Sequence, residues 1–435
     1  MIGSNQLWTS ADLVPSGDDL LEQIVDRRNM IKACKRVVAN EGNPGVDKMT
    51  TQELPGWLQR NLDRLSGSLL EGTYRPQTVR LVEIEKPGGG KRELGIATVV
   101  DRTIQQAIHQ VLNPLFDPDF STSSFGYRKG KSAEQAVLQA QRFQQEGKRW
   151  VVDVDLSKFF DEVNHDVLMA KIKRRVKDKR VLKLIDLYLR TGIMHGGVAS
   201  PRTKGTPQGS PLSPLLSNIL LNELDQELEK RGHSFCRYAD DFVIFVKSEK
   251  AAQRVYDSVI SFIERKLKLK INKSKSRITK GHRLTFLGYG FLPGDHVRLT
   301  VPKDVQKRFR MKAKLLFRKG RGMNLHRFIK DYLNPFLRGW INYYKHCKVK
   351  TIAEDLDSWI RRRLRLIIWR QWKKPRTRFK RFISMGFDYD HAMQCAYNSR
   401  GEWWNSGSQH MNFVFPKSHF VKLGLVSLLE MIGFR

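Results

Sequence analysis

The chain has 435 residues, 40% of them hydrophobic and 28% charged, a balance that is typical of a folded protein and excludes a largely disordered one. Single hydrophobic cores rarely exceed about 250–300 residues, so we expect two or three domains. Lys and Arg total 78 against 44 Asp and Glu, a formal net charge of +34 that predicts nucleic acid as the partner, since the amphipathic anchor that docking on acidic lipid would need is absent.

Helices and strands alternate through the first two thirds of the chain. Apolar residues recur near every 3.6 positions between about residues 20 and 75, which predicts helices interrupted by a turn at Asn43–Gly45. Alternation over Arg80–Ile84, a glycine-rich stretch at Lys86–Gly90 and a second extended run at Arg92–Leu94 predict a hairpin with a glycine-rich tip.

Aspartates interrupt the strands that are predicted farther along. Trp150–Leu156 is a short, valine-rich run typical of a buried strand, yet it contains two aspartates. A second strand pair, Phe235–Tyr238 and Phe242–Val246, has Ala239–Asp241 at its turn. Helices are expected in the gaps, over Asp101–Leu112, Asp178–Leu189, Leu212–Arg231 and Ala251–Leu267.

The character of the chain changes after about Pro293. Residues 301–386 hold 26 Lys and Arg against 5 Asp and Glu, a net charge of +21, in helix-forming sequence without a clear strand. This pattern predicts a second, basic, helical domain. Residues 389–435 mix tryptophan and phenylalanine with glycine and serine, and their pattern assigns no structure.

The aspartates in these strands need partners, because burying a carboxylate costs several kcal/mol unless it is paired or bound to a metal. This applies to Asp153, to Asp155 and to the pair Asp240 and Asp241. An Asp-Asp pair alone usually marks a solvated turn, but here apolar strands flank it on both sides. Nucleotidyl transfer favours two divalent ions about 3.5–4 Å apart, held by carboxylates. An aspartate leaving one strand and a doublet at a neighbouring hairpin suit that arrangement.

Three sequence boxes resemble those of reverse transcriptases and follow one another in that family's order. Tyr238–Asp241 resembles the catalytic box, Asp155–Asp161 the first metal-binding box, and Gly205–Pro214 the template and nucleotide loop. Within that superfamily, nearly the whole chain resembles the bacterial group II intron reverse transcriptases, also called maturases. The further landmarks of this resemblance are Asn43–Asp47, Arg92–Ile96, Ser124–Arg128, Asn164–Asp166, Phe286–Tyr289, Gly339–Tyr343 and Arg361–Arg365.

The resemblance implies an α+β fold, a right-hand polymerase whose fingers and palm contain a small antiparallel sheet and are followed by an all-helical thumb. It implies an N-terminal helical extension over residues 1–75, fingers and palm over 76–293, and an RNA-binding thumb of the maturase type over 294–388. Residues 389–435 would form a segment that resembles a DNA-binding one, without the endonuclease that many relatives carry at the C-terminus.

The matching boxes also imply roles for single residues. Asp155, Asp240 and Asp241 match the catalytic triad that binds two Mg²⁺ ions, for which Mn²⁺ is a substitute. Asp153 is expected to be structural and to help place the end of the strand. Phe160 matches the bulky steric gate that collides with a ribose 2′-hydroxyl and so favours deoxynucleotides; the alternative is a core aromatic.

Other residues match groups around the incoming nucleotide. Gln208 and Gly209 match the loop beside it, where a glycine lets the backbone approach closely. Lys86 and Arg92 match the fingers residues that close on the triphosphate, although a basic pair at a hairpin tip is more often only solvated. Lys275 matches the lysine that protonates the departing pyrophosphate, and a second lysine two residues earlier competes for this role.

The basic helical region carries the expected nucleic-acid contacts. An apolar face toward the core would leave arginines facing phosphates, with a solvated arginine face as the alternative. The four arginines that would face phosphates are Arg361, Arg362, Arg363 and Arg365. Just before this helical region, the turn in Phe286–Tyr289 resembles the primer grip.

Two positions depart from the family pattern, which usually has glycine where Ser210 stands and proline where Ala97 stands. Ser210 adds a side chain beside the nucleotide loop, which would alter template handling or rate without removing the chemistry. The four cysteines lie far apart and offer neither a zinc spacing nor a disulfide framework. No signal-peptide pattern and no run of about 18 apolar residues is present, so we expect a cytoplasmic protein with no membrane partner.

The leading hypothesis is an RNA-directed DNA polymerase that copies RNA into DNA and binds intron RNA to assist splicing and mobility. Its partners would be an RNA template, intron RNA, a DNA primer or target, and dNTPs; the oligomeric state is left open. One alternative is a reverse transcriptase domesticated for DNA repair or phage defence. The other is a non-catalytic RNA-binding splicing cofactor, against which the intact aspartate triad argues.

Overall fold

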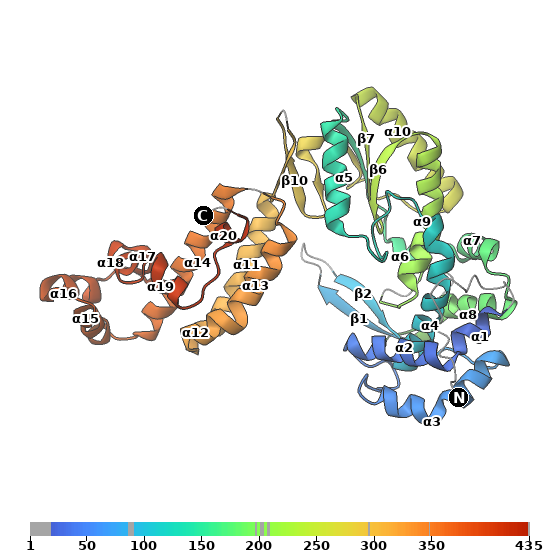
Figure 1. Ribbon diagram of the computed structural model, residues 1–435, viewed down its shortest axis with the longest axis horizontal. Helices are drawn as coiled ribbons and strands as arrows, with labels where there is room; N and C mark the ends of the chain where they lie inside the picture. The colour runs from blue at the N-terminus through green and yellow to red at the C-terminus, as the bar shows by residue number, and fades with distance from the viewer. Residues whose placement is uncertain are drawn as a thin grey trace, which may run out of the picture. The chain divides into compact units, whose positions relative to one another are not determined.

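The computed structural model describes residues 19–85, 91–195, 198–200, 204–206, 209–294, 296–347 and 349–433. The chain forms two compact units, the first ending at Lys280 and the second beginning at Gly281 (Figure 1). The change of character near Pro293 thus falls shortly after the boundary between the units. The finer division into extension, fingers and palm, thumb and C-terminal segment stays a prediction.

Helices and short strands make up the first unit. Its helices are α1 (Leu20–Val25), α2 (Arg27–Ala39), α3 (Leu54–Leu70), α4 (Val99–Phe116), the 3₁₀-helix η1 (Asp117–Asp119), α5 (Ala133–Gln145), α6 (Phe159–Glu162), α7 (His165–Arg175), α8 (Lys179–Arg190), α9 (Ser213–Lys230), α10 (Glu249–Phe262) and the π-helix η2 (Ile263–Leu267). Its strands are β1 (Val79–Glu85), β2 (Lys91–Ile96), β3 (Trp150–Val154), β4 (Ile193–His195), β5 (Val198–Ser200), β6 (Ser234–Tyr238), β7 (Asp241–Val246) and β8 (Arg277–Lys280). These elements confirm the predicted helices and strands to within a few residues at each end.

An antiparallel four-stranded sheet, in the order β6-β7-β3-β8, forms the centre of the first unit. The neighbouring residues Val151 and Val152 of β3 point to opposite faces, and both are fully buried. Both faces of the sheet are therefore covered, which explains why the strands are continuously apolar rather than alternating. Helices α5 and α10 pack against this sheet (Figure 1).

A second sheet, in the order β2-β1-β4-β5, lies among the N-terminal helices. Strands β1 and β2 form the predicted hairpin, with Arg80 paired to Ile96, while its tip at residues 86–90 lies outside the described residues. Helix α4 packs against α1 and α2, and the Thr98 side chain caps its first turn by accepting from the Asp101 N–H at 3.1 Å.

Asp101 is a buried carboxylate whose partners are all structural. The Tyr74 hydroxyl donates to it at 2.7 Å and the Tyr188 hydroxyl at 3.2 Å, while the Thr98 hydroxyl donates at 2.7 Å. Burial raises the pKa of Asp101 above the ordinary aspartate value. These contacts join the start of α4 to α8 and to the chain before β1, so this aspartate holds the fold together.

The second unit is mainly helical. It contains the short strands β9 (Thr285–Phe286), β10 (Tyr289–Leu292) and β11 (Arg298–Thr300). Its helices are η3 (Gly281–Arg283), α11 (Lys303–Lys319), η4 (Gly320–Gly322), α12 (Leu325–Phe328), η5 (Ile329–Leu333), α13 (Asn334–Tyr343), α14 (Lys350–Gln371), α15 (Pro375–Ser384), α16 (Tyr389–Tyr397), α17 (Glu402–Gly407), α18 (Gln409–Val414), α19 (Lys417–Lys422) and α20 (Leu428–Met431). The strand β11 corrects the expected onset of purely helical structure after Pro293, because its three residues are too few to leave a periodic pattern.

Helix α14 is the core of the second unit. Leu356, Ile360 and Leu364 recur at four-residue spacing along one face and are buried. The previously unassigned residues after 388 form short helices, of which α17 and α20 pack on α14. The Asp357 carboxylate of α14 accepts from the Leu428 N–H at 3.0 Å, which ties α20 to this helix. Among the described residues, no helix is long and apolar enough to cross a membrane.

Candidate active site

Three aspartates meet at one end of the sheet in the first unit. In the ladder between β3 and β7, Val154 pairs with Phe242, so the next residues in register are Asp155 and Asp241. Asp241 also pairs with Tyr238 across the hairpin of β6 and β7. The turn therefore consists of Ala239 and Asp240 alone, one residue shorter than predicted, with Asp241 as the first residue of β7.

Burial and neighbouring carboxylates both disfavour the charged form of Asp241. Although its side chain reaches solvent, its pKa is raised to about 6, because the surrounding protein disfavours the charged form and neighbouring aspartates repel its charge. The repelling groups are Asp240, Asp155 and Asp153, and Lys275 acts in the opposite direction. The Nζ atom of Lys275 lies 3.8 Å from Asp155 Oδ2. The structure thus places Lys275 at the site.

The donor chemistry of this corner suits divalent cations. Carboxylate oxygens are the ligands that Mg²⁺ prefers, and a cation there would offset the burial and the repulsion that together raise the pKa of Asp241. Across the described ranges, no three His, Cys, Asp or Glu side chains converge closely enough to surround one ion. The strand register therefore places Asp155 beside Asp241, but their carboxylate groups do not converge on one point.

Asp153 has a partner of its own. It accepts a hydrogen bond from Arg277 Nε of the neighbouring strand β8 at 3.3 Å, and the two residues are paired in the ladder. Burial raises the pKa of Asp153, and Arg277 opposes that shift. This contact joins β3 to β8 just before Asp155, which agrees with the expected structural role.

A fully buried ion pair supports the hairpin of β6 and β7. Arg237 of β6 and Asp225 of α9 are both 0% exposed, with Arg237 Nη2 2.6 Å from Asp225 Oδ2. Arg237 Nη1 donates to the Asn218 side chain at 2.9 Å and to the Ala239 carbonyl at 3.0 Å. The last bond fixes the turn that carries Asp240, where Ala239 has a left-handed φ of 58°.

The segment Ser124–Arg128 packs against the same turn. The Phe125 N–H donates to the Arg237 carbonyl at 2.8 Å, and a side chain at Gly126 would place its Cβ 2.3 Å from the Ala239 nitrogen. Only glycine allows this approach, because any Cβ would push the turn aside. The sequence marked this segment as a family landmark without assigning it a task; its contact with the turn arises from residues more than a hundred positions apart.

A pocket of about 650 Å³ opens beside Phe160 in the first unit. Phe160 and Gly209 line it, together with Leu94 and Gly95 of β2. Phe160 is 8% exposed and stacks edge-on against Phe159 at 5.2 Å between ring centroids. The structure therefore brings the expected steric gate and the nucleotide loop to one cavity. Arg102 and Gln106 also line the pocket, and no motif had indicated them; Tyr127, from the landmark segment Ser124–Arg128, lines it as well.

The nucleotide loop is anchored by its small residues. Gly209 has a φ of 102°, and a Cβ there would lie 3.1 Å from the Leu94 side chain, so its close neighbour is strand β2. Ser210 is buried and its hydroxyl hydrogen-bonds the Gln105 side chain of α4. The departure at Ser210 therefore adds a contact between the loop and α4. Ala97 is buried directly before α4, and its backbone packs against Gly45.

Some predicted nucleotide-binding residues cannot be placed. Lys86 and Gln208 lie outside the described residues. The backbone of Arg92 belongs to β2, where it pairs with Ile84, while its side chain also lies outside the described part of the chain. The roles expected of these three residues stay predictions.

The turn that resembles the primer grip is a tight hairpin between β9 and β10. Phe286 pairs with Tyr289, and both residues between them have positive φ, 50° at Leu287 and 79° at Gly288. The Tyr343 hydroxyl donates to the Leu287 carbonyl at 2.8 Å, and Tyr289 hydrogen-bonds the Tyr343 carbonyl in turn. Helix α13 thereby holds the turn rigidly.

The four arginines of α14 divide into two kinds. Arg365 is buried, donates to the Phe415 carbonyl at 3.0 Å, and has its pKa lowered to about 10 by burial. Arg362 donates to the Trp403 carbonyl at 2.8 Å and stacks 4.0 Å from its ring centroid. The expected phosphate-facing orientation is therefore corrected for Arg365, because the C-terminal helices cover that face of α14. Arg361, Arg362 and Arg363 are only partly buried and stay candidates for phosphate contact.

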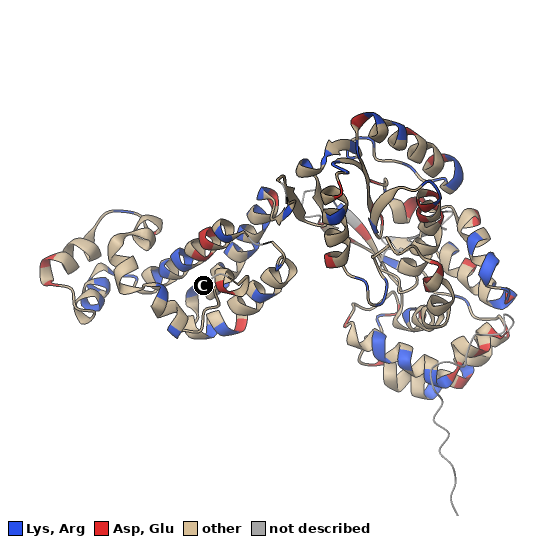
Figure 2. Cartoon of the chain, turned by 45° about the horizontal axis from the view of Figure 1, so that its top comes forward, with Lys and Arg blue, Asp and Glu red and all other residues tan. Residues whose placement is uncertain are grey.

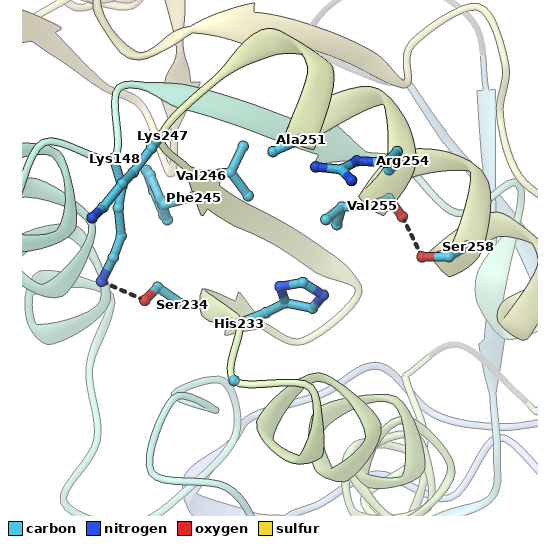
Figure 3. A pocket seen from close by; sticks show the side chains of 11 residues that line it. Lys148, His233, Ser234, Phe245, Val246, Lys247, Ala251, Arg254, Val255 and Ser258 are labelled. Atoms are coloured by element: carbon cyan, nitrogen blue, oxygen red, sulfur yellow. Dashed lines mark hydrogen bonds between the residues drawn. The ribbon is translucent and has the colours of Figure 1, made fainter.

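A second hollow of about 600 Å³ lies at the end of β7 opposite the aspartates (Figure 3). His233 faces Arg254 and Val255 of α10 across it. Lys148 lies at its edge and donates to the Ser234 hydroxyl at 2.8 Å. Lys148 also forms an ion pair with Glu146 at 2.8 Å, so much of its charge is already neutralised.

Comparison with known proteins agrees with this geometry. Residues 84–291 match the family "Reverse transcriptase (RNA-dependent DNA polymerase)", and residues 306–384 match "Group II intron, maturase-specific domain". Protein YkfC of Escherichia coli (strain K12) is 33% identical over 325 residues, which cover 64% of this chain and 85% of YkfC. The group II intron-encoded protein LtrA of Lactococcus lactis subsp. cremoris is 29% identical over 300 residues, covering 54% of this chain and 50% of LtrA.

The match to the reverse transcriptase family therefore identifies the chain as an RNA-directed DNA polymerase with a polymerase fold. A reverse transcriptase region followed by a maturase-specific one narrows the class further. The chain belongs to the group II intron reverse transcriptase and maturase family.

Proposed function

We propose that the chain copies RNA into DNA at the sheet end where Asp155, Asp240 and Asp241 meet, and that these three aspartates bind two divalent ions. The register that sets Asp155 beside Asp241 is the observation that carries this proposal. Such ions, Mg²⁺ or Mn²⁺, activate the attacking oxygen and stabilise the leaving one. The sheet would be the palm of a right-hand polymerase, the sheet of β1 and β2 part of its fingers, and the helices of the second unit its thumb.

The residues around this site would handle the dNTP. Phe160 forms a wall of the adjoining pocket, where a ribose 2′-hydroxyl would collide with it. Lys86 and Arg92 of the fingers hairpin would neutralise the triphosphate. Lys275 would give a proton to the departing pyrophosphate, a role that the 3.8 Å distance of its ammonium from Asp155 supports. Gln208 and Gly209 would bound the pocket on the side of the loop.

The second unit would bind RNA. Residues 301–386 carry a net charge of +21, and Figure 2 shows Lys and Arg along these helices with few acidic residues between them. LtrA is described as a group II intron-encoded protein. We extend this to the present chain and infer that its RNA partner is an intron whose splicing and mobility it assists, with a DNA primer or target as the second nucleic acid.

Primer extension on an RNA template tests the polymerase. With dNTPs and Mg²⁺ we expect a DNA product, and chelation of the divalent ions should abolish it. A product that persists after chelation would contradict the role of the aspartates. If no product forms under any divalent ion while RNA still binds tightly, the protein is a splicing cofactor without polymerase activity.

Substituting the steric gate should change the sugar preference. In Phe160→Ala, we expect incorporation of ribonucleotides relative to deoxynucleotides to rise about 10- to 100-fold, because the wall that excludes the 2′-hydroxyl is removed. Phe160→Tyr keeps the ring and is the matched control, with an unchanged preference expected. The ratio of kcat/KM for GTP and dGTP measures the effect, and equal ratios in all three proteins would assign Phe160 to the core alone.

A further inference from the structure

A basic pocket of about 260 Å³ opens within the second unit. Helix α11, the short helix η4 and helix α14 line it, with Phe317 and Ile367 as its apolar part. Its volume corresponds to about nine water molecules, which is room for a phosphate group and part of a sugar. The pocket is lined by five cations, Lys314, Arg318, Arg321, Arg363 and Arg370.

Helical spacing gathers these charges. Lys314 and Arg318 lie four residues apart on α11, and Arg363 and Arg370 lie seven apart on α14, so each pair projects from one face of its helix. Like charges four residues apart, such as Lys314 and Arg318, destabilise a helix slightly, and an anion between them would offset this repulsion. The two helices thus direct their repelling groups into one cavity.

Carboxylates neutralise little of this charge. Arg370 forms an ion pair with Glu402 at 2.6 Å. The side chains of Lys314, Arg318 and Arg321 have no carboxylate partner within the described ranges. The pocket therefore keeps a positive field that a bound anion would compensate.

The guanidinium group of Arg363 packs against two tryptophan rings at the wall of the pocket. It lies 5.2 Å from the ring centroid of Trp359 and 4.5 Å from that of Trp403. Its Nε atom is buried and has no hydrogen-bond partner among the described residues. Burial lowers the pKa of Arg363, and the nearby guanidinium groups of Arg370, Arg362 and Arg321 lower it further. A buried N–H donor without an acceptor, surrounded by positive charges, favours the binding of a negatively charged acceptor.

We propose that this pocket binds a phosphodiester group of a nucleic-acid strand, with Arg318 and Arg321 at its mouth and Arg363 at its wall. The proposal deepens the proposed function, on which it rests for the claim that the second unit binds nucleic acid. The phosphate belongs either to single-stranded RNA or to a template–primer duplex. A guanidinium fork matches phosphate oxygens in pairs, which favours this ligand over a diffuse contact with the surface.

The test compares two double variants of the full chain. Arg318→Gln with Arg321→Gln removes two exposed cations from the pocket. Lys312→Gln with Lys319→Gln removes two exposed cations of α11 that do not line it, and is the matched control. Affinity for a single-stranded RNA oligonucleotide and for an RNA–DNA template–primer duplex is measured between about 50 and 200 mM salt. Thermal unfolding verifies that both variants are folded.

We expect the pocket variant to bind one of the two probes about tenfold more weakly. The slope of log affinity against log salt should flatten by about 0.7 for single-stranded RNA or about 0.9 for the duplex, the loss of one phosphate contact. The probe that responds identifies the source of the phosphate. An equal loss in both variants, or no loss in either, would overturn the proposal. Primer extension at saturating template–primer reports the polymerase separately, so failure of one proposal is distinguishable from failure of the other.

Discussion

Replacing Asp240 and Asp241 together with alanine is expected to lower primer extension about 10³-fold or more. The paired divalent ions contribute several kcal/mol to the transition state of nucleotidyl transfer, and each 1.4 kcal/mol corresponds to a factor of ten in rate. Removing both carboxylates leaves Asp155 as the single proposed ligand at this end of the sheet. Single-nucleotide incorporation at saturating dNTP measures the effect, and RNA affinity should not change.

The control for this substitution is Asp153→Asn. Asp153 lies two residues before Asp155 on the same strand, but it is bonded to Arg277 of β8. Its loss should lower extension less than about tenfold, because the amide keeps an oxygen that can accept from Arg277. If Asp153→Asn were as inactive as the double alanine variant, Asp153 would be a metal ligand and the assignment of the triad would need revision.

Breaking the buried pair of Arg237 and Asp225 is expected to cost about 3–5 kcal/mol of stability, because the remaining charge would be buried without a partner. Arg237→Met should therefore lower the free energy of local opening around β6 and β7, measured by hydrogen exchange. Extension should also fall in the folded fraction, since the bond from Arg237 to the Ala239 carbonyl, which fixes the turn carrying Asp240, is lost.

A double variant separates the two effects of that substitution. Asp225→Leu combined with Arg237→Met replaces the ion pair by apolar groups, and such replacements are often neutral or stabilising. We expect stability to recover while extension stays low, because the Ala239 carbonyl still lacks its donor. Full recovery of extension would mean that the pair serves stability alone and does not position the turn.

Local pattern and motif order determined much of the active site in advance. The valine-rich run ending near Asp155 and the two apolar strands around Asp240 predicted a buried sheet with aspartates at its end, because strand periodicity and burial depend on neighbouring residues. The boxes around these aspartates then indicated a reverse transcriptase. The position of Phe160 five residues past Asp155 matched the steric gate of that family; the structure places Phe160 and Gly209 on the lining of one pocket, and the role of Phe160 stays a prediction.

Only the tertiary structure decided which polar residues are structural. Asp153 and Asp155 look alike in sequence, and their difference comes from Arg277, which is 124 residues away from Asp153. The sequence indicated Arg365 as a phosphate ligand, but in the structure the C-terminal helices cover its side chain. The partners of these side chains belong to distant segments, and no local periodicity encodes which segments meet.

The same reason explains the contacts that the sequence left without a role. Gly126 approaches Ala239, which is more than a hundred residues away in the sequence. The buried ion pair of Arg237 and Asp225 joins strand β6 to helix α9. The basic pocket needs two helices to place their cations on facing sides. The sequence by itself determined the chemistry, through residue types and their short spacings; the packing of distant elements decided which groups are held, covered or left facing a ligand.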